Sequence, residues 1–183
     1  MIYYKSKYLS NNLQINLARW KRWSREFLPP DTLSGMQSGY ARQFSLKEAF
    51  IVFLAGHLVG TFRFSIDEAR RIMSDLSAWL KENGFHDMRP VSELLLRKPV
   101  ENHFIFIFKT GAGHFGYVIR SLIHAEQGET SVLSSANDRT SLIGLKADPI
   151  TQGSAVCARM ICISALYLQF LRRLNSMPDK VPE

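Results

Sequence analysis

The residues best suited to chemistry with a partner are basic side chains near the start of the chain. Residues 1–46 carry seven Lys and Arg against two Asp and Glu. Four of the basic residues lie in one short segment and a fifth lies in a later loop: Arg19, Lys21, Arg22, Arg25 and Arg42. Such side chains neutralise phosphates, and arginine also pairs with guanine in the major groove. The cluster predicts binding to a polyanion, although a solvated helix face would carry the same residues.

The length, charge and hydrophobicity of the whole chain limit the class of protein that it can be. It has 183 residues, a net charge of +7, 46% hydrophobic and 21% charged residues, which is typical of one ordinary folded domain or two small ones. The N-terminus lacks a signal-peptide pattern. The most apolar stretch, residues 155–171, contains Arg159 and is shorter than the roughly 20 residues that cross a bilayer. We therefore expect a cytoplasmic protein with no membrane segment.

A second pattern with chemical meaning is the glycine-rich run Gly111–Gly116, which spells GxGxxG after a predicted strand. In dinucleotide-binding domains this pattern joins a strand to a helix, with an acidic residue about 20 positions later, as Asp138 is here. The flanking residues are rich in β-branched side chains, which favours strands on both sides. We expect a hairpin turn, with a nucleotide site as the alternative.

No other pattern predicts catalysis. The five histidines have no metal-ligand spacing, and the two cysteines, Cys157 and Cys162, form neither a CxxC motif nor a disulfide framework. Nucleophile-elbow, HExxH and paired-carboxylate motifs are also missing from the sequence. We expect no enzymatic activity, no metal and no cofactor.

The basic cluster falls on a predicted helix. This helix begins at the N-cap residue Asn16 and ends before Pro29 and Pro30. Apolar residues recur along it at helical spacing, as Leu17, Trp20, Trp23 and Phe27. We expect both tryptophans to lie in the core rather than to stack on DNA. The basic residues then lie largely on other faces of the helix.

Two further helices are predicted from capping boxes, in which a serine and a glutamate three residues later satisfy backbone N–H groups at a helix start. The predicted helices cover residues 46–59 and 66–84. The two pairs are Ser45 with Glu48, and Ser65 with Glu68. The polar segment before Ser45 predicts a short two-stranded wing.

Read together, three segments resemble the MerR-type winged-helix DNA-binding domain: Asn16–Trp23, Phe27–Pro30 and Ser38–Ser45. The resemblance covers about residues 5–82 and requires a first helix between Tyr3 and Leu13. It implies that the second helix enters the major groove and that the wing follows the flanking backbone. The DNA-binding residues that it implies are Arg19, Lys21, Arg22 and Arg25 on the helix, with Tyr40 and Arg42 on the wing.

Residues 89–183 have a different pattern of apolar residues from the first part of the chain. Their β-branched and aromatic runs predict strands, and the last apolar stretch predicts a long helix from after Pro149 to about Leu174. One stripe of this helix is free to pair with a second copy of the chain, unless hairpins cover both of its faces. The stripe comprises Val156, Met160, Ile163, Tyr167, Phe170 and Leu174. The expected strands cover residues 103–109, 115–123, 130–133 and 140–145.

The sequence thus predicts an α+β protein. A MerR-like winged helix-turn-helix domain, residues 1–88, precedes a small hairpin-rich module with a long C-terminal apolar helix, residues 89–183. We expect a homodimeric, sequence-specific transcriptional regulator that binds double-stranded DNA, with an effector or protein partner as a further possibility for the second module. The alternatives are a protein-interaction adaptor built on a winged helix, and a nucleotide-binding protein that uses the Gly111–Gly116 loop.

Overall fold

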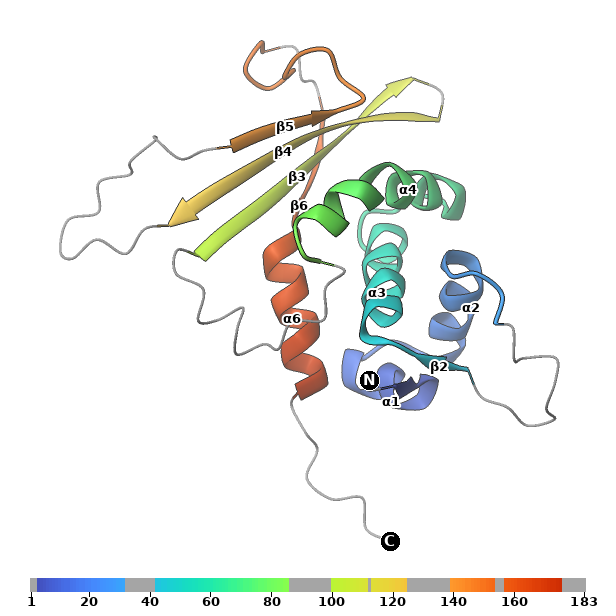
Figure 1. Ribbon diagram of the computed structural model, residues 1–183. Helices are drawn as coiled ribbons and strands as arrows, with labels where there is room; N and C mark the ends of the chain where they lie inside the picture. Colours follow the sequence, from blue (N-terminus) through green and yellow to red (C-terminus); the bar gives the residue numbers. More distant parts are fainter. Residues whose placement is uncertain are drawn as a thin grey trace, which may run out of the picture. The chain divides into compact units, whose positions relative to one another are not determined.

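The computed structural model describes residues 3–31, 42–85, 100–111, 113–124, 139–153 and 157–175. These residues form a mixed α+β protein with two antiparallel sheets (Figure 1). The chain divides into two compact units. The first comprises Met1–Met88 with Gln169–Glu183, and the second comprises Arg89–Leu168.

The first unit is mainly helical. Strand β1 leads into α1, and strand β2 leads into α3; the two strands pair antiparallel, with Tyr4 opposite Phe44. Helix α3 packs beside α2 and α4 (Figure 1). The bounds are β1 (Tyr4–Lys5), α1 (Ser6–Leu13), α2 (Leu17–Phe27), β2 (Gln43–Phe44), α3 (Leu46–Gly60) and α4 (Ile66–Glu82).

The helix starts agree with the sequence predictions. The Asn16 side chain accepts hydrogen bonds from the backbone N–H groups of Ala18 and Arg19. Both predicted capping boxes are present, at the first turns of α3 and α4. Local side-chain to backbone hydrogen bonds therefore set where these helices begin.

Helices α1 and α2 are joined by a tight turn of three residues, 14–16. Gln14 ends α1 in the left-handed conformation, with φ of 57°. The hydroxyl of Ser10, a buried side chain, donates to the carbonyl of Ile15 at 2.6 Å. The turn therefore has a defined geometry that requires a positive φ at position 14, where the chain has a residue with a Cβ atom.

Replacing Gln14 by glycine should raise the free energy of unfolding by up to about 1 kcal/mol. The left-handed conformation costs a residue with a Cβ atom roughly 1–2 kcal/mol, and the greater backbone entropy of unfolded glycine offsets part of that gain. Urea unfolding monitored by tryptophan fluorescence measures the change. Gln14→Ala retains the steric cost and is the control; an equal gain in both variants would contradict the explanation.

The core of the first unit is aromatic. Trp20 is fully buried and packs edge-on against Phe44. Trp23 is only 8% exposed and lies against Gly56 of α3. The prediction that both tryptophans belong to the core is confirmed.

The second unit contains a four-stranded antiparallel sheet in the order β5-β4-β3-β6 (Figure 1). Gly111 pairs with His114 at the turn between β3 and β4, and Gly113 has a φ of +74°. The hairpin prediction is confirmed. The strand–loop–helix arrangement of a dinucleotide site is not present, because Gly113 is followed by a paired strand and not by a helix. The bounds are β3 (Val100–Gly111), β4 (His114–His124), β5 (Arg139–Ile143) and β6 (Arg159–Cys162); the predicted strand 130–133 lies outside the described residues.

The prediction of one long apolar helix after Pro149 is wrong. Residues 149–153 form turns, Arg159–Cys162 form β6, and only Ile163–Asn175 form helix α6. Strand β6 pairs with β3, with Met160 opposite Phe106. The backbone N–H and C=O groups of Arg159–Cys162 form hydrogen bonds with β3 at the edge of the sheet. Helical periodicity in the sequence does not reveal this pairing, because strand formation depends on neighbouring strands. No described helix is long and apolar enough to cross a membrane.

The stripe predicted to form a dimer is divided between these two elements. Met160 is on β6 and is 50% exposed. The other described members are buried within the chain itself: Ile163, Tyr167, Phe170 and Leu174. Val156 lies outside the described residues. This stripe therefore offers no continuous helical surface to a second copy, and the homodimer remains a prediction without an assigned surface.

Candidate nucleic-acid interface

Helix α2 carries its basic residues on the side away from the core. Trp20, Trp23 and Ser24 are buried. At about 100° per residue, Arg22 and Arg25 fall on the opposite side of the helix, while Lys21 and Arg19 flank them. All four basic side chains belong to exposed residues. The helical periodicity of the sequence thus gives α2 one apolar face in the core and one cationic face toward solvent.

The four basic side chains of α2 differ in the contacts that they make within the protein. The Arg19 guanidinium lies 5.9 Å from the centre of the Trp23 ring, and Arg25 Nε donates to the carbonyl of Lys21 at 3.3 Å. Among the described residues, the side chains of Lys21 and Arg22 have no hydrogen bond or ion pair. Their charges are therefore available to a ligand.

The one acidic residue of α2 does not cancel this charge. Glu26 forms an ion pair with Arg70 of α4, whose Nε also donates to the Glu26 carbonyl at 2.9 Å. Arg70 additionally contacts Asp67 at 3.0 Å. A C-terminal helix carbonyl lacks an intrahelical partner, so Arg70 both caps α2 and pairs with its acidic side chain.

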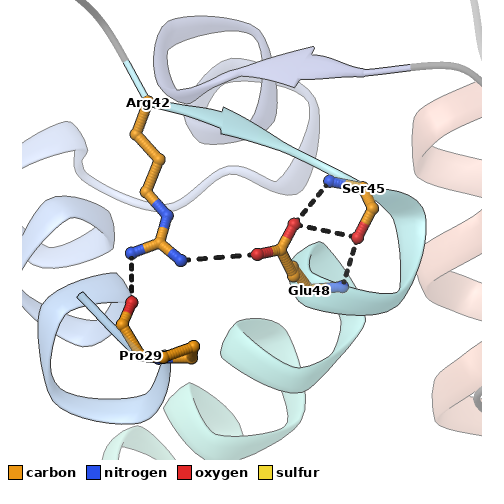
Figure 2. Close-up of polar contacts among 4 residues, drawn as sticks. All are labelled: Pro29, Arg42, Ser45 and Glu48. Atoms are coloured by element: carbon orange, nitrogen blue, oxygen red, sulfur yellow. Dashed lines mark hydrogen bonds and ion pairs between the residues drawn. The ribbon is translucent and has the colours of Figure 1, made fainter. Parts of the chain in front are cut away.

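Arg42 was predicted to contact DNA, and the structure places it in a different setting. Figure 2 shows its guanidinium donating to the Pro29 carbonyl at 3.0 Å and approaching Glu48 Oε1 at 3.4 Å. The other Glu48 oxygen accepts from the Ser45 backbone N–H and hydroxyl, both at 2.9 Å. The Arg42 side chain is 18% exposed and also lies over the Phe44 ring.

These contacts give Arg42 a structural task. They connect the residues that follow α2 to the capping box that begins α3, and they engage both terminal nitrogens of the guanidinium. A group held in this way has little freedom to reach a phosphate. Tyr40, the other predicted wing contact, lies outside the described residues.

Sequence reasoning missed the supporting roles of Arg42 and Arg70. The Asp67–Arg70 spacing of three residues is compatible with a helical ion pair, but the Glu26 partner is 44 positions away. The Pro29 carbonyl is likewise 13 positions from Arg42. Neither pairing has a local signal in the sequence.

The described residues include no group of three or more His, Cys, Asp or Glu side chains placed to hold a metal ion. His103 Nδ1 lies 2.7 Å from the Ser121 hydroxyl, but both side chains are buried in the sheet of the second unit. This pair satisfies polar groups in a core rather than presenting a nucleophile to solvent.

Comparison with known proteins adds no relative. No family model, curated protein sequence or solved structure matches the chain. The chain is an α+β protein.

Proposed function

We propose that the protein is a sequence-specific transcriptional regulator that binds double-stranded DNA through the exposed face of α2. The observation that carries this proposal is the combination of geometry and charge: two helices joined by a three-residue turn, with the second presenting Arg19, Lys21, Arg22 and Arg25 outward. In helix-turn-helix proteins the second helix of such a pair enters the major groove. The MerR-type resemblance of the sequence supports the same orientation.

The positions on α2 suggest different tasks for its cations. Arg22 lies near the middle of the exposed face, where it would reach the base edges at the floor of the groove; arginine pairs with guanine O6 and N7. Lys21 and Arg19 lie toward the sides, where phosphates would flank the helix. Arg25 is one turn further along. In this proposal Arg42 positions α2 and does not touch DNA.

A dimer fits this function, because two copies would read two half-sites related by the symmetry of the protein. No described surface is assigned to that contact. A selection from random duplex DNA, performed with the full chain, would show a two-fold related sequence if the protein binds as a symmetric dimer. A single half-site would favour a monomer.

Replacing Lys21, Arg22 and Arg25 together by alanine should abolish specific binding to the selected duplex. Each phosphate contact that is lost should also reduce the magnitude of the negative slope of log K against log salt by about 0.9. Fluorescence anisotropy over a range of salt concentrations measures both effects. Lys81→Ala, at an exposed residue of α4, removes one positive charge outside α2 and should leave the affinity nearly unchanged.

Two outcomes would overturn the proposal: a wild-type chain that binds no duplex at low salt, or a triple variant that binds as the wild type does. A protein partner retained by Arg19→Ala plus Arg22→Ala would then favour the adaptor alternative.

A further inference from the structure

The first unit contains a cavity of about 320 Å³ that is open to solvent, between the end of α2, α3 and α4. Its apolar lining consists of Phe27, Ile51 and Met73. Ligand pockets in proteins commonly begin at about 300 Å³ and combine an apolar lining with a few polar groups. The polar groups here are Glu26, Arg70, Ser74 and Ser77. The cavity therefore has a volume at the lower end of the range for small-molecule sites, with polar residues forming more of its lining than in most of them.

The polar lining is balanced in charge. It contains one carboxylate, Glu26, and one guanidinium, Arg70, which are paired with each other. Arginine has five N–H donors, and the described contacts of Arg70 engage three: one to the Glu26 carbonyl, one to its carboxylate and one to Asp67. Arg70 is 47% exposed. Two donors thus remain beside a carboxylate that can still accept a hydrogen bond.

We propose that this cavity binds an uncharged amphiphile whose head group both accepts and donates hydrogen bonds, such as an aliphatic carboxamide. The carbonyl would accept from Arg70, the amide N–H₂ would donate to Glu26, and the alkyl chain would contact Phe27, Ile51 and Met73. At about 30 Å³ for each water-sized group, the volume accommodates roughly ten non-hydrogen atoms, which is the size of octanamide.

Charge balance is the basis of the selectivity. An anionic head group would gain from Arg70 but would meet the Glu26 carboxylate. A cationic head group would gain from Glu26 but would meet the Arg70 guanidinium. Either ion would also lose part of its hydration on entry. A carboxamide avoids both repulsions and can pair with both side chains.

The test uses the full chain without DNA and three probes of nearly equal size: octanamide, octanoate and octylammonium. Isothermal titration calorimetry should show octanamide binding at least fivefold tighter than either ion. Absence of octanamide binding, or a preference of the wild-type protein for one of the ions, would overturn the proposal. Because no DNA is present, this result does not depend on whether the protein is a transcriptional regulator.

Two variants test whether Glu26 and Arg70 form the site. Glu26→Gln leaves a net positive lining and should change the preference to octanoate, while Arg70→Met leaves a net negative lining and should change it to octylammonium. Arg71→Gln alters the next residue of α4, which does not line the cavity, and should retain the preference for octanamide. Glu26→Gln keeps a hydrogen-bonding side chain toward Arg70, so it tests the site even if Arg70→Met fails to fold. Preferences unchanged in Glu26→Gln would refute the assignment.

Discussion

Replacing Phe170 by alanine should lower the free energy of unfolding of the first unit by about 3–5 kcal/mol, the usual cost of removing a buried phenylalanine side chain. Phe170 is fully buried. Its ring centre lies 5.3 Å from that of Phe50 and 5.4 Å from that of Phe53. The substitution would leave a cavity between α6 and α3, although more than 100 residues of sequence separate these elements.

Tryptophan fluorescence during urea unfolding can measure this loss selectively. All three tryptophans, Trp20, Trp23 and Trp79, belong to the first unit. Gln169→Ala, at the exposed neighbouring residue, is the control and should change stability by less than about 0.5 kcal/mol. A loss below about 1 kcal/mol in Phe170→Ala would contradict a role for this ring in the core.

The same packing predicts that residues 1–88 alone form an incomplete unit. Besides Phe170, the end of α6 supplies a carbonyl at Leu174 that accepts from the Tyr8 hydroxyl at 2.9 Å. Arg173 Nη1 donates to the carbonyl of Leu13 at 3.0 Å, which lies at the end of α1. These bonds connect the last helix to the helix-turn-helix segment.

Replacing Gly56 by alanine should destabilise the first unit by about 2 kcal/mol. A Cβ atom at this position would lie 2.3 Å from two atoms of the Trp23 ring, closer than any real contact. Overpacking a core costs about 1–3 kcal/mol, and replacement of glycine in a helix returns about 1 kcal/mol. Because a buried indole cannot move aside easily, we expect an overpacking cost near the upper end of that range, about 3 kcal/mol, which leaves a net loss of about 2 kcal/mol after the gain in helix propensity.

Gly60→Ala is the matched control for this prediction. It lies on the same helix, but its added Cβ atom would be 3.8 Å from the nearest atom of Trp23, an ordinary contact. This variant should be neutral or stabilised by up to about 1 kcal/mol. Urea unfolding of the two variants side by side separates the steric effect from helix propensity; equal stabilities would show that Trp23 does not pack against Gly56 as described.

Several elements could be predicted from the sequence because their determinants are local. The Ser45–Glu48 and Ser65–Glu68 pairs set the starts of α3 and α4 through hydrogen bonds that span three residues. Gly111 at the end of β3 and Gly113 in the turn likewise permit a tight hairpin. For α2, helical periodicity was enough to separate the buried tryptophans from the outward-facing cations.

The last apolar segment shows where that reasoning fails. Its residues satisfy a helical pattern, but backbone pairing with β3 makes the first part a strand, and packing buries the rest. The sequence alone shows that these residues are apolar. It does not show which surface covers them, because burial depends on partners distant along the chain.

For the candidate DNA-binding site, the sequence by itself determined which residues are cationic and which helix carries them, since charge and periodicity are properties of neighbouring residues. Only the tertiary structure separated Lys21 and Arg22, which face solvent, from Arg42, which binds Pro29 and Glu48. An arginine has the same charge in both settings. Its availability to DNA depends on whether the fold brings carbonyl and carboxylate groups within reach of its guanidinium, and those contacts form only when separate helices pack together.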